Sequence, residues 1–103
     1  MIWYTAIMSR LQFLKEHRGK ILALADRRGG YNVRVFGSVV RGEESAASDI
    51  DFLMTFREGT TLFDRGGLVF DLREYLRCDV DVVSDKTVHP LIREEVYHSA
   101  VAL

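Results

Sequence analysis

Cysteine, proline and histidine are scarce in this chain of 103 residues, which has one cysteine, one proline and three histidines. The single Cys78 excludes an internal disulfide and is typical of a reducing compartment, so we expect a cytoplasmic protein. His17, His89 and His98 lie on different predicted elements and lack the spacing of zinc ligands. His89 precedes Pro90 and is predicted to be a turn residue. The sequence therefore favours neither a disulfide-stabilised fold nor a structural zinc site.

Long apolar runs and an excess of charge of one sign are also missing. No run approaches the roughly 20 residues that span a bilayer, and no basic segment precedes the apolar start, so we expect neither a membrane span nor a signal peptide. The formal net charge of -1 supplies no broad basic surface for direct nucleic-acid binding. With 48% hydrophobic residues, the composition indicates one globular domain over residues 1–103, with an N-terminal extension at 1–9.

Hydrophobic periodicity predicts helices that alternate with strands. Gly29-Gly30 is expected to end the first helix. Helices are predicted over 5–28 (with a break at Gly19), 38–41, 60–76 and 90–98, strands over 31–36, 50–56 and 80–83, a loop at 42–48, and a strand or docked tail at 100–103. Such alternation indicates an α/β (α+β) domain in which helices flank one small mixed β-sheet.

Two aspartates in the segment SDIDFLM are the first candidates for chemistry. Asp49 and Asp51 lie two residues apart along a predicted strand, so their side chains leave one face, with Cα atoms roughly 6.5–7 Å apart. Two such carboxylates repel each other unless a cation lies between them, and oxygen ligands suit Mg²⁺ or Mn²⁺. The alternative is an ordinary solvated strand face.

A glycine and a serine follow the first predicted strand and open a short helix. We call Gly37 and Ser38 the Gly-Ser corner. A glycine there lets the backbone approach a ligand closely, and unpaired N–H groups at a helix start favour phosphate. The Ser38 hydroxyl can donate to a phosphate oxygen, although a simple helix cap is the alternative role.

A third carboxylate is expected if two metal ions act together, one on the attacking oxygen and one on the leaving group. The segment CDVDVVS, residues 78–84, is the strand that offers acids. Asp79 and Asp81 share one face of that strand, so alternation does not choose between them.

Two segments resemble a known family. GSVVRGEESAASDIDFLM, residues 37–54, is similar to the Gly-Ser-x-x-Arg-Gly…Ser-Asp-Ile-Asp signature of the DNA polymerase beta-like nucleotidyltransferase superfamily, and is closest to the minimal nucleotidyltransferases (MNT) of prokaryotes. VDVVSDKTVHPLIREEVYHSAVAL, residues 80–103, resembles the family's C-terminal segment, whose strand carries the third carboxylate. The likeness covers roughly residues 10–103 and selects Asp81. Val40 departs from the family's usual alanine, which affects helix packing more than chemistry.

The resemblance implies a nucleotidyltransferase core and a role for each candidate residue. The Gly-Ser corner would hold the phosphates of ATP. Arg41 would contact a phosphate or a carboxylate, or would be a structural charge. Asp49 and Asp51 would bind two Mg²⁺ ions, with Mn²⁺ as a substitute. Asp81 would complete one metal site and help to deprotonate the acceptor hydroxyl.

The function implied by this resemblance is transfer of AMP from ATP to a hydroxyl group, with release of pyrophosphate. The chain is too short to include an acceptor-binding domain, so we expect the acceptor to dock from outside, as another protein. The resemblance to the minimal branch implies an antitoxin that silences a HEPN-type toxin by modifying a tyrosine or by direct complex formation. Ile2, Trp3 and Tyr4 suit such an interface, core packing or self-association, in a homo- or hetero-oligomer. The alternatives are a non-catalytic antitoxin that neutralises its partner by complex formation, and a small-molecule nucleotidyltransferase.

Overall fold

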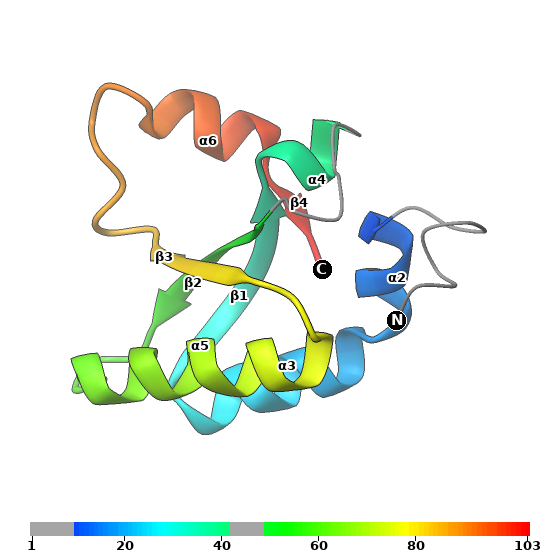
Figure 1. Ribbon diagram of the computed structural model, residues 1–103. Helices are drawn as coiled ribbons and strands as arrows, with labels where there is room; N and C mark the ends of the chain where they lie inside the picture. Colours follow the sequence, from blue (N-terminus) through cyan, green and yellow to red (C-terminus); the bar gives the residue numbers. More distant parts are fainter. Residues whose placement is uncertain (1–9, 42–48) are drawn as a thin grey trace.

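The computed structural model describes residues 10–41 and 49–103 (Figure 1), so the predictions for 1–9 and for the loop 42–48 lie outside the described residues. The elements are α2 Arg10–Glu16, α3 Arg18–Arg27, β1 Gly30–Phe36, α4 Ser38–Arg41, β2 Ile50–Phe56, α5 Leu62–Leu76, β3 Val80–Ser84, α6 Arg93–Ser99 and β4 Val101–Ala102. This alternation confirms the predicted α/β class. Within the described ranges, no helix has both the length and the apolar character needed to cross a membrane.

The strands form one mixed sheet in the order β3-β2-β1-β4. β2 and β3 are parallel, whereas β1 is antiparallel to both β2 and β4. Figure 1 shows α3 and α5 on one side of this sheet, with α6 and α4 toward the other. The last strand settles the prediction for residues 100–103, because Val101 pairs with Val35 of β1.

The main hydrophobic core lies between the sheet and the pair α3 and α5. Ile50, Phe52 and Met54 of β2 point into it and are buried, as their alternation predicts. The opposite face of the same strand carries Asp51 and Leu53. The candidate carboxylates therefore lie on the face of the sheet that turns away from the main core.

The first predicted helix is broken at His17 rather than at Gly19. The imidazole Nδ1 of His17 lies 2.6 Å from the hydroxyl of Tyr75 in α5, and its ring packs on Phe13 with centroids 4.4 Å apart. These tertiary contacts hold His17 between α2 and α3. Gly19 lies on the exposed side of α3, where its low helix propensity is tolerated.

The last helix begins three residues later than predicted. Pro90 and Leu91 belong to a turn, and α6 starts at Arg93 with Ile92 as its N-cap. The turn is closed by His89, whose carbonyl accepts from the Ile92 N–H at 3.0 Å and whose Nδ1 accepts from the Leu91 N–H at 3.1 Å. These local hydrogen bonds replace the first turn that the proline was expected to open.

Candidate active site

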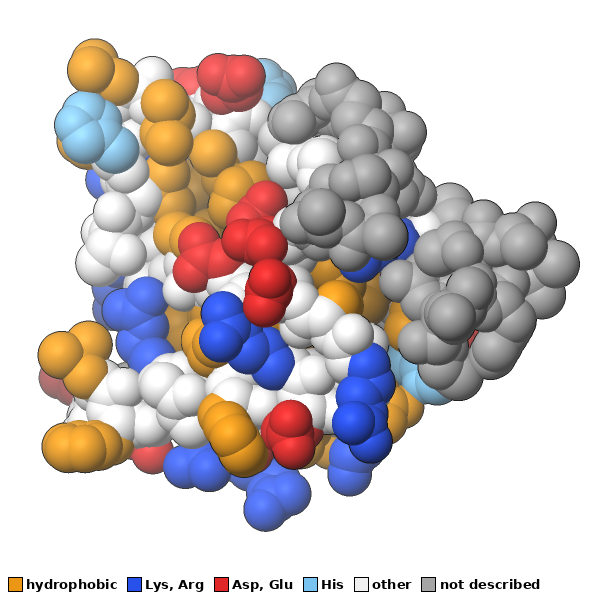
Figure 2. Space-filling model, in the orientation of Figure 1, with side chains coloured by type: hydrophobic (Ala, Val, Ile, Leu, Met, Phe, Trp, Pro, Cys, Tyr) orange, Lys and Arg blue, Asp and Glu red, His pale blue; other side chains and the backbone are white. Residues whose placement is uncertain are grey.

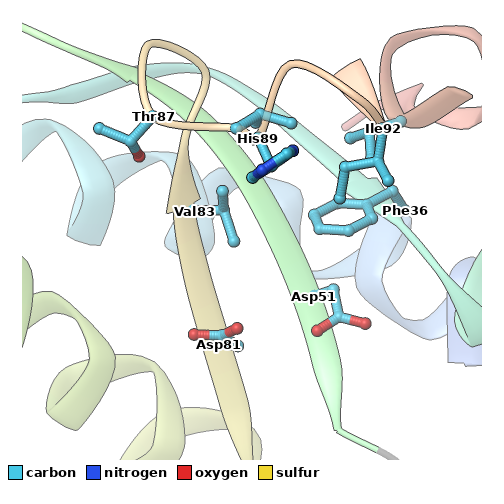
Figure 3. A pocket seen from close by; sticks show the side chains of 9 residues that line it. Phe36, Asp51, Asp81, Val83, Thr87, His89 and Ile92 are labelled. Carbon is cyan, nitrogen blue, oxygen red and sulfur yellow. The ribbon is translucent and has the colours of Figure 1, made fainter. Parts of the chain in front are cut away.

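Two of the predicted carboxylates lie side by side on neighbouring parallel strands. Asp51 of β2 pairs in register with Asp81 of β3. Partners at the same height in a sheet point to the same face. Both line one pocket of about 300 Å³, in which Asp51 is half-buried and Asp81 is exposed (Figure 3). The parallel pairing thus brings two acids together from positions thirty residues apart in the chain.

The other two acids lie at the start of these strands. Asp49 is exposed, one residue before β2, and is not among the residues that line the pocket. The backbone carbonyl of Asp79 accepts from the Ile50 N–H at 3.0 Å, and the Asp79 carboxylate lies 3.9 Å from the guanidinium of Arg73. Register therefore places Asp81, and not Asp79, beside Asp51, a distinction that alternation alone does not make.

The Gly-Ser corner approaches Asp51 directly. Gly37 has a φ of +78°, a conformation that side chains disfavour. A Cβ atom added there would lie 2.6 Å from Oδ2 of Asp51. Phe36, the preceding residue, is the antiparallel partner of Asp51 in the sheet. A glycine is required at this corner because the backbone turns left-handed against the carboxylate.

Ser38 and Arg41 are the first and last residues of α4, which confirms the helical turn predicted at 38–41. Ser38 is half-buried. The side chain of Arg41 lies outside the described residues, and its contact with phosphate remains a prediction. Val40 is partly buried and packs against the main core, so the larger side chain is accommodated in place of the family's usual alanine.

The remainder of the pocket is mostly apolar. It is lined by Phe36, Val83, Val88, Ile92 and Val96, together with the polar Thr87 and His89. Figure 2 shows acidic side chains gathered beside a hydrophobic area on this side of the molecule. The interpretation of His89 as a turn residue does not predict that it lines the pocket. Its position between β3 and α6 is the feature of the sequence that could have indicated this.

The donor set limits how a metal ion could be held. In the described parts of the chain, no group of three or more His, Cys, Asp or Glu residues is arranged to hold one. Asp51 and Asp81 supply two paired carboxylates. Mg²⁺ is commonly held by one or two carboxylates together with the phosphates of its substrate, rather than by an all-protein cage. The pair therefore fits a Mg²⁺ ion that arrives with a nucleotide.

Two arginines of α5 lie along β3. Arg65 donates from Nη2 to the carbonyl of Val82 at 3.3 Å, and its guanidinium lies 5.3 Å from the ring centroid of Phe56. Arg73 lies opposite Asp79. Figure 2 shows Lys and Arg side chains next to the acidic group. This edge of α5 places positive charge along β3, a feature that the helix pattern does not reveal.

The single cysteine is not among the residues that line the pocket. Cys78 is half-buried at the end of α5, and this burial raises the pKa of its thiol. A thiol whose pKa is raised stays protonated near neutral pH and is a poor nucleophile. Cys78 is therefore an inert residue that packs against the core.

Comparison with known protein families shows which family this chain belongs to. The family described as "Nucleotidyltransferase domain" matches residues 14–103. This chain belongs to the nucleotidyltransferase family. A relative of this nucleotidyltransferase from Methanocaldococcus jannaschii, named "Putative protein adenylyltransferase", is 35% identical over 88 residues, which are 85% of this chain and 95% of the relative. The family resemblance of residues 37–54 and 80–103 is thereby confirmed.

Solved structures support the same assignment. One described as a "putative minimal nucleotidyltransferase" is 42% identical, with a TM-score of 0.82 over 94% of this chain and 98% of that chain. A toxin–antitoxin complex with AMP-PNP is 23% identical, with a TM-score of 0.70 over 82% and 69%. A tri-AMPylated Shewanella oneidensis HEPN toxin in complex with its MNT antitoxin is 20% identical, with a TM-score of 0.65 over 85% and 69%. The last two share the fold of this nucleotidyltransferase.

Proposed function

We propose that this nucleotidyltransferase moves AMP from ATP to a tyrosine hydroxyl of a HEPN-type toxin and thereby acts as a cytoplasmic antitoxin. The observation that carries the proposal is the in-register pair of Asp51 and Asp81 beside the Gly-Ser corner. Carboxylate oxygens next to a glycine at a helix start suit phosphoryl transfer, where catalysis is mostly positioning and electrostatic stabilisation. The proposed acceptor is supplied by a second protein.

We assign the roles that the family resemblance implies. The Gly-Ser corner would hold the triphosphate, with Arg41 as a further contact, and Asp49 and Asp51 would hold two Mg²⁺ ions, with Asp81 completing one of the two sites. Bound Mg²⁺ would neutralise charge on the phosphates and favour the deprotonated form of an acceptor hydroxyl. The Asp81 carboxylate takes the proton from that hydroxyl.

The proposed reaction is a single displacement at the α-phosphorus of ATP. The acceptor oxygen forms a bond to the α-phosphorus, and the bond from that phosphorus to the oxygen bridging the α- and β-phosphates breaks. Pyrophosphate leaves with the electron pair, and the proton passes from Asp81 to solvent. The product is a phosphodiester between AMP and the tyrosine side chain.

Two kinds of relative support the acceptor class. The proteins from M. jannaschii that align with most of this chain carry the name protein adenylyltransferase. The structural neighbours include an AMPylated toxin bound to its antitoxin. The same complexes favour a second candidate function, neutralisation of the toxin by binding alone. A small-molecule acceptor has no comparable support among these relatives.

The test is incubation of the protein with labelled ATP, Mg²⁺ and the product of the neighbouring gene. We expect label on a partner tyrosine, and loss of at least a hundredfold in rate for Asp51→Asn and for Asp81→Asn. Asp79→Asn is the matched control and should keep its activity, because Asp79 faces Arg73 rather than the pocket. Transfer that survives in both Asp51→Asn and Asp81→Asn would refute the catalytic assignment. Protection of cells by a complex without label transfer would establish the binding function instead.

A further inference from the structure

The pocket beside Asp51 and Asp81 extends away from the Gly-Ser corner. The corner follows Phe36 at the end of the sheet where β2 begins, since Phe36 pairs with Asp51. Val83 and the residues after β3 lie further along the strands and line the rest of the pocket. In the proposed function the phosphates occupy the corner, and this pocket is the adjoining space for the nucleoside.

The size and lining of the pocket suit a flat heteroaromatic ring. Its volume of about 300 Å³ is at the small end of the range of ligand sites, which are mostly apolar with a few polar groups that fix orientation. Phe36 and Ile92 form one wall, and Val83 lies opposite them (Figure 3). The hydroxyl of Thr87 donates to the carbonyl of Ser84 at 3.2 Å. His89 is then the polar group left to address a ring edge.

The tautomer of His89 is fixed by its own turn. The backbone N–H of Leu91 donates to Nδ1 of His89 at 3.1 Å. An N–H group can only donate, so Nδ1 is the acceptor, and the neutral imidazole carries its proton on Nε2. The imidazole projects into the pocket between Val83 and the Phe36–Ile92 wall (Figure 3). His89 thus offers the pocket a hydrogen-bond donor.

The segment that carries His89 is anchored at several points. The N–H of Asp85 donates to the Met54 carbonyl at 2.9 Å, and its carboxylate Oδ2 accepts from Thr55 at 2.5 Å and from Arg34 at 3.2 Å. Val88 is buried. The donor is therefore held in place before any ligand arrives, which is what discrimination between similar rings requires.

We propose that His89 reads the nucleobase: its Nε2–H donates to a ring nitrogen of a purine seated against Phe36 and Ile92. This inference rests on the proposed function for the location of the phosphates. It assigns the nucleotide preference to one residue. A purine presents ring nitrogens as acceptors along its edges, and replacement of the correct one by C–H removes the hydrogen bond while leaving the shape of the ring.

The test measures binding of ATP and of its 1-deaza, 3-deaza and 7-deaza analogues by isothermal titration calorimetry, with Mg²⁺ and without the partner. We expect the parent protein to bind one of the three analogues about 3–10-fold more weakly than ATP, the usual worth of one hydrogen bond to a neutral group. His89→Ala should bind ATP and that analogue equally well. His89→Gln, which keeps an N–H donor, should restore part of the discrimination. His98→Ala on the exposed side of α6 is the matched control and should behave as the parent.

Three results would overturn the inference: equal binding of ATP and all analogues by the parent, retained discrimination in His89→Ala, or no binding of ATP at all. A fourth would be unchanged ATP binding in His89→Ala together with a raised KM for the toxin, because the pocket would then hold the acceptor. Failure of the proposed function is distinguishable, since it appears as absence of label transfer while base discrimination persists in calorimetry.

Discussion

The two faces of the sheet use the same strands for different purposes. On one face, Phe52 and Met54 are fully buried beneath α3 and α5. On the other face, α6 and the segment before it cover only part of the surface, so Leu53 is buried while Asp51 is half-buried and Asp81 is exposed. The candidate site lies on the part of this face that α6 and the segment before it leave uncovered. The main core thus lies on one face and the candidate site on the other, and the first three of the five predictions below test this division.

The largest loss of stability is expected for Phe52→Ala on the core face. Removing a fully buried phenyl group costs about 3–5 kcal/mol, a large part of the stability of a small domain. Urea unfolding followed by circular dichroism measures the change. Phe70→Ala on the outside of α5 is the control, because Phe70 is 63% exposed, and should shift the free energy of unfolding by less than about 0.5 kcal/mol. Equal effects would contradict the assignment of the core to this face.

A smaller loss is expected for Leu53→Ala on the site face. Leu53 is as buried as Phe52, but the cover over it is thinner and can collapse into the space, so we expect about 2 kcal/mol, the low end for a buried leucine. The same urea titration measures it, with the exposed Leu62→Ala as control. A cost equal to or above that of Phe52→Ala would contradict the expected difference in cover between the two faces.

Gly37→Ala is expected to cost about 1–2 kcal/mol of stability, because its φ of +78° is left-handed, and to lower AMP transfer about a hundredfold through displacement of Asp51. Gly59→Ala separates these two effects. Gly59 has a φ of +89° but nothing within 4 Å of an added Cβ, so its alanine variant should be strained yet fully active. Measurement of kcat and of the free energy of unfolding for both variants separates the two effects. Equal losses of activity in Gly37→Ala and Gly59→Ala would show that backbone strain alone is responsible.

The smallest effect is expected at the start of α5. Thr61 Oγ1 accepts from the Asp64 N–H at 3.1 Å, and the Asp64 carboxylate accepts from the Thr61 N–H at 3.0 Å. Thr61→Ala should cost about 1 kcal/mol, the usual value for an N-cap, while Thr61→Ser should be close to neutral. Urea titrations at neutral pH measure both.

The same pair gives a pH dependence. Hydrogen bonds from Thr61 lower the pKa of Asp64 below its usual value. The Asp64 carboxylate therefore binds a proton more readily in the unfolded chain than in the folded one. Its contribution to the free energy of unfolding is present at neutral pH and is lost as the pH falls through the folded pKa of Asp64. The difference between the parent and Asp64→Asn should accordingly shrink in acid. A difference that grows in acid would contradict this sign.

Local patterns predicted much of this fold. Alternation of side chains located β2 at residues 50–56 as the structure has it, and Gly29-Gly30 marked the end of α3. Prediction of the pairing between Asp51 and Asp81 requires the register of two strands thirty residues apart. The alternation of side chains within each strand carries no information about that register. The break at His17 and the place of His89 depend on Tyr75 and on the turn before α6, so tertiary contacts decided them. The family signature supplied the choice of Asp81 in advance of that register.

The position of β3 has a consequence for behaviour at high concentration. Among the described strands, β3 and β4 are the two edge strands, and edge strands can recruit strands of other molecules through their free backbone groups. The guanidinium of Arg65 already occupies the carbonyl of Val82 on this strand. An incoming strand would have to displace that cation, so Arg65 of α5 also protects the protein against edge-to-edge aggregation.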